Sequence, residues 1–430
     1  MTKPIAFLDA HVIDPSQDLD DKGTVLVEDG IIKAIKSKAS SKKLKADYDI
    51  VDCSDKILIP GIIDCQVRTG EPGNEHEETL ASASQAAVAG GVTTMITQPD
   101  TNPVIDDMAL VDFISRNASA NAVSKVHVMG ALTKKLMGEE MSELRLMHEA
   151  GAVAFTNGHH SIKNARIMRR ALSYARDFNG LIVHHAEDRD LTHGGVMNEG
   201  EMATRLGLGG IPKMAEIIML ERDVRLSELT GGRYHVACIS CAESVEIVRQ
   251  AKKRGLNVTC GVSINNVTLN ENDIGSYRTF FKLSPPLRLE EDRMAIVEGI
   301  KDGTIDVVHS DHSPHDVDMK RHPFADAADG AVGLETLLPA LLRLVHNDEI
   351  NLSDAVRVLS YNPAKLLDLK TGTLKKGAPA DIALVDINEP WVLIEETLKS
   401  RSKNTAFEGA KFTGRVLKTY VDGCEVYSHR

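Results

Sequence analysis

A chain of 430 residues is long enough for one large hydrophobic core with an appended domain, because single cores rarely grow beyond about 250–300 residues. Hydrophobic residues make up 42% of the chain and charged residues 26%, which is ordinary for a soluble globular protein and excludes a mostly disordered one. The net charge of -12, with basic residues clustered only between Lys33 and Lys45, argues against nucleic-acid and membrane partners.

Cysteine usage and the N-terminal segment predict the cellular compartment. Six cysteines at irregular spacing do not form the framework of a disulfide-rich secreted protein, and they fit a reducing environment. The N-terminal segment has no apolar core of the kind that a secretion signal needs, and no stretch of the chain approaches the length of a membrane-spanning helix. We therefore expect a cytoplasmic protein that is neither exported nor membrane-spanning.

Both ends of the chain have the pattern of β-strands. Residues 5–37 and 373–427 alternate apolar and polar side chains, with turn signals at Glu28-Asp29-Gly30 and Val421-Asp422-Gly423. Neither end supplies enough strands for a stable sheet, so the two ends are expected to pair into one small β-sandwich. Residues 1–57 and 372–430 would form this discontinuous domain, and residues 58–371 would form the other.

Between the two ends, short runs rich in Val and Ile alternate with segments of helical period, which is typical of parallel βα units. In the expected helix over residues 164–178, Ile167, Ala171 and Ala175 recur at four-residue steps. Eight such units predict a closed (β/α)8 TIM barrel. The expected strands are residues 58–67, 92–98, 125–132, 152–157, 181–187, 234–240, 258–263 and 305–311.

Polar and reactive side chains follow several of these strands. In barrel enzymes the chemistry takes place at the carboxyl ends of the strands, so these positions are the first candidates for a site. Because side chains alternate along a strand, those at positions 66 and 68 are expected to point together into the barrel mouth. The candidates are Gln66, Arg68, Asn157, His185, Cys238 and Asp311.

The sequence resembles the dihydroorotases and allantoinases, which are cyclic-amide hydrolases of the amidohydrolase superfamily. The resemblance covers nearly the whole chain, and the family fold is a (β/α)8 barrel with a β-sandwich built from both chain ends, in agreement with the pattern above. The segments that carry it are PGIIDCQVRTGEPG (60–73), AGGVTTMITQPDTNPVID (89–106), HHAED (184–188), HGGVMNEGEMATRLGLGGIP (193–212), KLSPPLR (282–288), SDHSPH (310–315) and GLETLLP (333–339).

The resemblance implies a zinc site whose ligands are mostly replaced in this chain. Gln66 and Arg68 stand at the family's His-x-His pair, Asn157 at the ligand position of strand four, and Cys238 at the histidine of strand six. An amide is a poor zinc ligand and a guanidinium cannot coordinate a metal at all. The electrostatic repulsion between a guanidinium and a divalent metal ion about 4 Å away is roughly 8 kcal/mol at an effective dielectric constant of 20.

Two of the family's metal ligands are retained, namely His185 and Asp311. In the family, the residue at the position of Asp311 is both a metal ligand and the general base. A thiolate is a good zinc ligand, so a rebuilt site with one zinc ion held by His185, Cys238 and Asp311 is the alternative to no cofactor at all.

Several neighbouring residues allow other interpretations. His184 is interpreted as structural, and Cys238 and Cys241 as buried thiols rather than a redox pair. The loop pair His159-His160 could supply substitute ligands but is interpreted as solvated. A further hypothesis pairs Asp311 with Arg68 in an internal salt bridge that takes the place of the metal.

The family's binding site for the substrate carboxylate also differs here. The resemblance places it at Gly70, Asp100 and His315, where the family has an arginine, an asparagine and a histidine. Only His315 is retained. A carboxylate at position 100 would repel the substrate carboxylate, so dihydroorotate and carbamoyl aspartate should bind poorly.

The resemblance is greatest to non-catalytic family members that lack the zinc histidines and associate with aspartate transcarbamoylase in pyrimidine biosynthesis. It implies a structural partner of that enzyme, assembled as a homo-oligomer. The alternative is an active zinc-dependent dihydroorotase, or another cyclic amidohydrolase, with a rebuilt mononuclear site. A third hypothesis is a sensor that binds an anionic metabolite in the vacated pocket.

Overall fold

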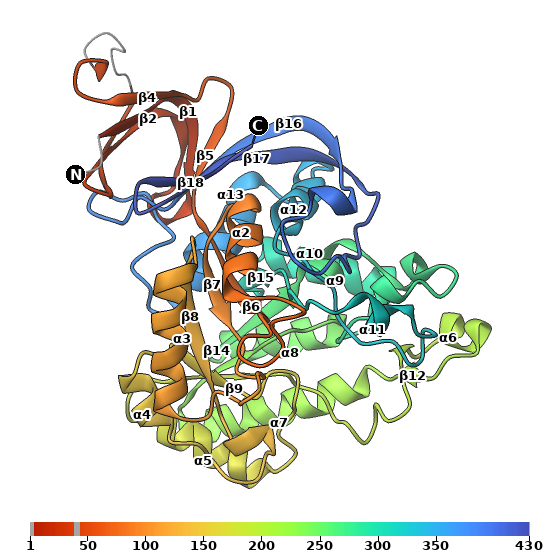
Figure 1. The fold of residues 1–430 in the computed structure, drawn as a ribbon. Helices are drawn as coiled ribbons and strands as arrows, with labels where there is room; N and C mark the ends of the chain where they lie inside the picture. Colours follow the sequence, from red (N-terminus) through yellow and green to blue (C-terminus); the bar gives the residue numbers. More distant parts are fainter. Residues whose placement is uncertain (1–3, 38–43, 430) are drawn as a thin grey trace.

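The computed structural model describes residues 4–37 and 44–429, so residues 38–43 of the basic segment lie outside the described part. Eight parallel strands pair in chain order into one sheet, which wraps into a nearly closed barrel (Figure 1). The eight barrel strands predicted from the sequence are confirmed. They are β6 (Ile62–Val67), β7 (Val92–Thr97), β8 (Lys125–Ala131), β9 (Ala154–Thr156), β10 (Leu181–His184), β13 (Arg233–Val236), β14 (Val258–Ser263) and β15 (Val307–His309).

The expected first strand, residues 58–67, is split between two sheets. Its first part lies in β5 (Ile57–Pro60), which pairs with β16 (Ile382–Val392) and β1 (Ile5–Asp14) outside the barrel. The chain crosses into the barrel at Gly61, where a Cβ atom would lie 2.1 Å from Oγ1 of Thr93. The crossing therefore requires glycine, and β6 begins directly after it.

Both chain ends contribute to a second, eight-stranded sheet, as the alternating pattern predicted. Its core includes Phe7 and Tyr420, whose rings meet edge to face at 4.9 Å, so the two ends of the chain pack directly on each other. Asp29 and Asp422 adopt positive φ at the two predicted hairpin turns. The other strands of this sheet are β2 (Leu19–Glu28), β3 (Ile31–Lys36), β4 (Asp49–Asp52), β17 (Lys411–Val421) and β18 (Cys424–Ser428).

Helices follow the barrel strands and form its outer layer (Figure 1). The predicted helix over residues 164–178 is confirmed as α5 (Ala165–Arg176), and the Asn164 side chain caps it by accepting a hydrogen bond from the Arg166 amide. The other long helices are α2 (Leu80–Ala89), α3 (Met108–Asn121), α7 (Met214–Thr230), α8 (Ala242–Lys253), α10 (Glu290–Lys301) and α12 (Leu337–His346). The short ones are α4 (Leu144–Glu149), α6 (Glu201–Leu206), α9 (Ile264–Thr268), α11 (Val317–Arg321), α13 (Leu352–Val356) and α14 (Asn362–Leu366).

The barrel closes where the residues after β15 meet the end of β6. The His312 amide donates to the Gln66 carbonyl at 3.2 Å, and the Arg68 amide donates to the His312 carbonyl at 2.9 Å. Behind this seam, the fully buried Asp64 carboxylate accepts hydrogen bonds from the amides of Gln66 and Ser310. The backbone of both former His-x-His positions is thus part of the barrel closure.

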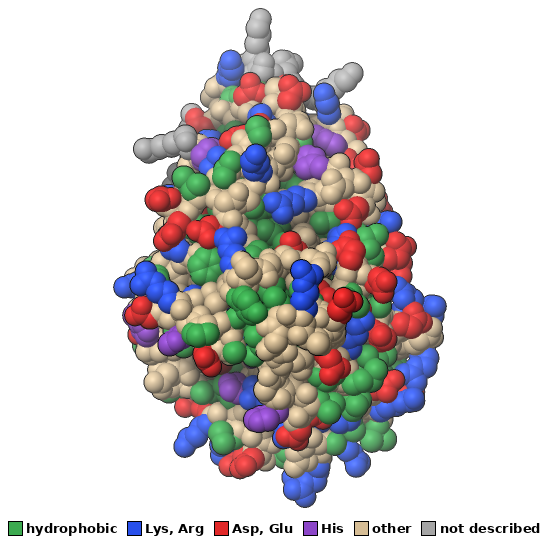
Figure 2. Space-filling model, turned by 90° about the vertical axis from the view of Figure 1, so that its right-hand side faces the viewer, with side chains coloured by type: hydrophobic (Ala, Val, Ile, Leu, Met, Phe, Trp, Pro, Cys, Tyr) green, Lys and Arg blue, Asp and Glu red, His purple; other side chains and the backbone are tan. Residues whose placement is uncertain are grey.

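The surface is polar and mixed in charge. On the face shown in Figure 2, acidic and basic side chains are interspersed among small apolar patches. Among the helices of the described residues, none combines the length and the apolarity that crossing a lipid bilayer requires.

The buried His235 of β13 gives the fold a predictable pH dependence. Burial, with the neighbouring His309, lowers its pKa to about 3, and its Nδ1 lies 2.8 Å from Oγ1 of Thr259. The unfolded chain takes up this proton near pH 6.5 and the folded chain does not, so stability decreases as the pH falls below about 6.5. We expect this term to total about 1.6 kcal/mol between pH 6.5 and 5 in urea unfolding, with the slope rising toward about 1.4 kcal/mol per pH unit, and we expect a shallower slope for His235→Gln.

The control is His346→Gln, at an exposed position on α12. A wild-type slope that the His235→Gln substitution leaves unchanged would contradict this account.

Candidate functional site

The candidate site is the mouth of the barrel, where residues that follow β6, β7, β9, β10 and β15 meet. The structure brings two groups of sequence-predicted side chains together there. One group is an ion pair between Arg68 and Asp100. The other is a histidine and aspartate cluster that includes His185 and Asp311, together with His159, which the sequence analysis had assigned to a solvated loop.

Arg68 is held inside the mouth by fixed partners. One guanidinium nitrogen lies 2.8 Å from the Asp100 carboxylate, and another donates to Oγ of Ser313 at 3.1 Å. The Arg68 side chain is only 25% exposed and that of Asp100 14%. The predicted ion pair between Arg68 and Asp311 is wrong, because Asp100 on the loop after β7 is the closer acceptor.

Asn157, which the resemblance places at the ligand position of strand four, is bound to the preceding loop through both ends of its side-chain amide. Its side-chain nitrogen donates to Oγ1 of Thr133 at 2.7 Å and to the Leu136 carbonyl at 3.4 Å, while its side-chain oxygen accepts from the Thr133 amide at 3.0 Å. The residue is 1% exposed. Its amide therefore joins the loop after β8 to the end of β9.

His159 lies between the two retained ligand positions. Its ring stacks on that of His185 with centroids 4.9 Å apart, and its Nε2 lies 3.7 Å from the Asp311 carboxylate. Burial lowers the pKa of His159, and the charge of Arg68 lowers it further. The interpretation of His159 as a solvated side chain is wrong, whereas its neighbour His160 is exposed.

The carboxylates of the mouth stay ionised despite their burial. Burial alone would raise the pKa of Asp311, but His159 and Arg68 lower it to about 2. In the same way, His185 outweighs burial and lowers the pKa of Glu187 to about 2. Nε2 of His185 lies 3.5 Å from the Glu187 carboxylate, is buried, and has no hydrogen-bond partner.

Cys238 is a buried thiol rather than a thiolate. Burial, with the nearby charge of Asp311, raises its pKa well above the ordinary value, so the proton stays on sulfur at neutral pH. Its Sγ accepts a hydrogen bond from the Ser263 amide at 3.3 Å. Cys241 is also a free, buried thiol, as the sequence analysis expected.

These residues do not fit the zinc site that the family resemblance implies. Across residues 4–37 and 44–429, no three His, Cys, Asp or Glu side chains converge in an arrangement that could hold a metal ion. Arg68 places a positive charge in the mouth, Asn157 is bound to Thr133, and Sγ of Cys238 accepts a hydrogen bond from the Ser263 amide. The set of His185, Cys238 and Asp311 is therefore not assembled as a metal site.

The substrate-carboxylate positions are also altered in shape. Gly70 has φ +66°, and a Cβ atom there would lie 2.6 Å from the Asn74 carbonyl, so this tight turn has no room for the arginine of the family. Asp100 is neutralised by Arg68, which weakens the repulsion expected from the sequence. Nε2 of His315 donates to the Asp329 carbonyl at 2.7 Å, so one ring nitrogen is already engaged.

His184 has the structural role that the sequence analysis predicted. Its Nδ1 lies 2.7 Å from the buried Asp223 carboxylate, and its Nε2 accepts a hydrogen bond from the Ile162 amide at 2.8 Å. Tyr234 and Arg222 donate to the same carboxylate. This network fixes the loop after β9 and so holds His159 in the mouth.

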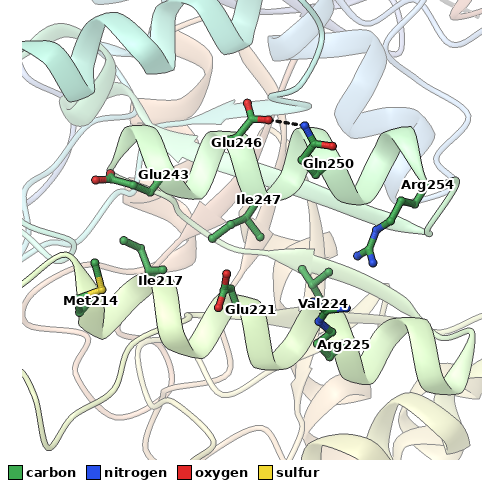
Figure 3. A pocket seen from close by; sticks show the side chains of 10 residues that line it. All are labelled: Met214, Ile217, Glu221, Val224, Arg225, Glu243, Glu246, Ile247, Gln250 and Arg254. Atoms are coloured by element: carbon green, nitrogen blue, oxygen red, sulfur yellow. Dashed lines mark hydrogen bonds between the residues drawn. The ribbon is translucent and has the colours of Figure 1, made fainter.

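A cavity of about 620 Å³ lies away from the mouth, on the outer surface between α7 and α8. Figure 3 shows Ile217, Val224 and Ile247 between the two helices, with Glu243 and Arg254 toward its ends. None of the ten side chains that line it is a histidine, cysteine or serine. The sequence-predicted residues all lie elsewhere, so we place the candidate site at the barrel mouth.

Comparison with solved structures gives the class of protein. The L-hydantoinase (dihydropyrimidinase) from Arthrobacter aurescens matches with a TM-score of 0.88 and 25% sequence identity, covering 99% of this chain and 96% of that one. The dihydropyrimidinase from Brevibacillus agri has the same fold, with a TM-score of 0.84 at 21% identity, 99% coverage of this chain and 95% of that one. The barrel and its end sheet thus define an amidohydrolase-type fold.

Sequence comparison gives the family. The chain is 42% identical to the dihydroorotase of Syntrophotalea carbinolica over 98% of this chain and 99% of the relative, and 39% identical to that of Ehrlichia canis over 99% and 95%. A family model described as dihydro-orotase-like matches residues 55–244. The chain belongs to the dihydroorotase family.

The Arg68–Asp100 pair should contribute measurably to stability. Removal of either partner leaves a largely buried charge without its counterion. In a double-mutant cycle with Arg68→Met and Asp100→Ala, we expect each single variant to be destabilised and the coupling energy from urea unfolding to be about 1–2 kcal/mol.

The matched control is the exposed ion pair between Arg116 and Asp112 on α3, for which the same cycle should give about 0.5 kcal/mol or less. Additive effects at Arg68 and Asp100 would show that the two side chains do not interact in solution.

Proposed function

We propose that this chain is a dihydroorotase-like protein of pyrimidine biosynthesis that does not hydrolyse dihydroorotate itself and acts as a structural subunit with aspartate transcarbamoylase. The observation that carries the proposal is the bonding of the former ligand positions. Arg68 is fixed by Asp100 and Ser313, and Asn157 is fixed by Thr133. These side chains form an internal framework rather than a set of free ligands.

The chemistry of the retained residues supports the same conclusion. A general base in this family acts on a water molecule that a metal has made acidic, since water alone is far too weak an acid at neutral pH. Asp311 is ionised, because His159 and neighbouring positive charges outweigh its burial and lower its pKa to about 2. Without a metal-bound water, its carboxylate has no sufficiently acidic proton to remove.

Substrate recognition is weakened as well. Dihydroorotate and carbamoyl aspartate carry carboxylates that need a cationic partner. The turn at Gly70 has no room for an arginine, and Arg68 is neutralised by Asp100. Nε2 of His315 already donates to a backbone carbonyl. A bound carboxylate would therefore have to displace existing contacts, which costs affinity.

The transcarbamoylase partner is supported by the resemblance to family members that lack the zinc histidines. The chain keeps the length of its relatives, with 98% of it aligned to 99% of the Syntrophotalea carbinolica dihydroorotase. A complete barrel with altered chemistry at its mouth is what a subunit that contributes surface would retain.

An active cyclic amidohydrolase with a rebuilt zinc site is the second candidate. It is favoured by Nε2 of His185, which is buried without a hydrogen-bond partner, an uncommon state for a polar atom. The Arg68 guanidinium opposes it, because it places a positive charge in the barrel mouth where the metal ion would bind.

One experiment tests both parts of the proposal. The chain is co-expressed with the aspartate transcarbamoylase of the same organism, purified through a tag on this chain, and separated by size exclusion. We expect co-elution in a fixed ratio. Hydrolysis of dihydroorotate is then measured, with added zinc, for the isolated chain and for the complex. The same assays are repeated with the Asp311→Asn variant of this chain.

Because Asp311 stands at the general-base position, any genuine hydrolysis by this chain should fall at least about 100-fold in Asp311→Asn. We expect the isolated wild-type chain to match that variant at background. Zinc-dependent turnover that the substitution abolishes would establish the second candidate. Separate elution of the two proteins at micromolar concentrations would refute the partnership.

A further inference from the structure

A second cavity, of about 550 Å³, lies beside the barrel mouth. Its walls are the segment around η4 (Thr279–Phe281), the loop with α11, and a C-terminal segment near residue 403. His315, which stands at the family's substrate-carboxylate position, forms part of one wall. The cavity is therefore next to the altered site but is lined mainly by other residues.

The lining is strongly basic in a protein whose net charge is -12. The lining holds four cations and one carboxylate, that of Glu395, and one of the cations, Arg278, is paired with Glu408 outside the lining. Such a concentration of one sign of charge in a recess favours an anionic ligand, because field lines focus within it. The four cationic side chains are Arg278, Lys320, Arg321 and Lys403.

Lys320 is the most informative of these cations. It is 4% exposed, and its ammonium donates to the carbonyls of Thr279 at 3.2 Å and Ala328 at 2.6 Å. Among the described residues, no carboxylate forms an ion pair with it. Burial lowers its pKa to about 8, because the nearby Asp329 carboxylate offsets the burial only in part and Lys282 lowers the pKa further. A bound anion would supply the counterion that this buried ammonium lacks.

Lys403 is in a similar state. Its ammonium donates to the carbonyls of Leu398 at 2.7 Å and Ser400 at 2.6 Å, without a carboxylate partner among the described residues. Arg321 is 75% exposed, and within residues 4–37 and 44–429 its one ion pair is a distant contact with Asp318 at 3.8 Å. These charges are therefore only weakly neutralised within the protein.

Two aromatic side chains complete the lining. Tyr277 is 47% exposed and has φ +62°, an uncommon conformation for a bulky side chain that is held by a hydrogen bond from its hydroxyl to the Leu206 carbonyl at 2.7 Å. Phe280 lies under the Arg278 guanidinium at 5.8 Å. A flat ring could stack against such side chains while an attached anion meets the lysines.

We propose that this cavity binds a small phosphorylated molecule with a flat ring, of the nucleotide class, through Lys320, Arg321 and Lys403 on one side and Tyr277 and Phe280 on the other. The inference goes beyond the proposed function and does not depend on it. It concerns the isolated chain and holds whether or not the chain hydrolyses dihydroorotate or binds a transcarbamoylase.

Calorimetric titration of the purified full chain in magnesium-free, low-salt buffer provides the test, with ATP, pyrophosphate, adenosine and citrate as probes. We expect saturable 1:1 binding of ATP, weaker binding of pyrophosphate, and no binding of adenosine. Affinity for ATP should fall at least about tenfold in Arg321→Ala, which removes a charged donor from an exposed position. Lys320→Met should also weaken it, provided its thermal unfolding matches that of the wild type.

Arg116→Ala is the matched control, because this arginine is 79% exposed on α3 and does not line the cavity. It should bind ATP as the wild type does. The proposal fails if ATP does not bind, if Arg321→Ala binds ATP as tightly as Arg116→Ala, or if citrate binds as tightly as ATP.

Discussion

The seam that closes the barrel is the constraint on which the rest of the structure depends. A sheet of parallel strands becomes a barrel only when its last strand bonds to its first, and here the residues after β15 bond to the end of β6 through the backbone of Gln66, Arg68 and His312. The buried Asp64 carboxylate fastens the same seam from within. The seam passes through the mouth, so barrel closure and the candidate site share residues.

This sharing explains how the fold persists while the ligand positions change. The backbone hydrogen bonds at positions 66 and 68 do not depend on side-chain identity, so these side chains can vary without opening the barrel. The Arg68 charge then needs a partner, which Asp100 supplies. His159 occupies the space between His185 and Asp311. The mouth is thus organised by ion pairs, hydrogen bonds and ring stacking.

Local patterns in the sequence predicted the architecture well. The alternation of Val- and Ile-rich runs with helical segments gave eight strands in order, and the hairpin turns at Asp29 and Asp422 were visible as short turn motifs. The sequence did not reveal that the chain crosses from one sheet to the other at Gly61, because this crossing depends on a tertiary contact with Thr93. The family motifs directed attention to Gln66, Arg68 and Asn157. The partner of Arg68 could not be predicted, since only the fold brings Asp100 to it.

His159 was the residue that sequence reasoning placed wrongly. Its position two residues after Asn157, at the carboxyl end of a barrel strand, was the available signal, but loop histidines are usually solvated. The position of His159 is set by the buried His184–Asp223 network, which fixes the loop after β9. The two residues of this pair are 39 positions apart in the sequence. Contacts of this kind leave no local pattern in a sequence.

The central claim is that the barrel mouth is organised without a metal ion. Its most direct test is thermal unfolding of the purified chain after chelation and after titration with zinc. A ligand that binds only the folded state adds about 2.7 kcal/mol at 100 times its Kd. The account predicts that the melting temperature changes by less than about 1 °C across the titration. A saturable increase of several degrees at one zinc per chain would contradict it.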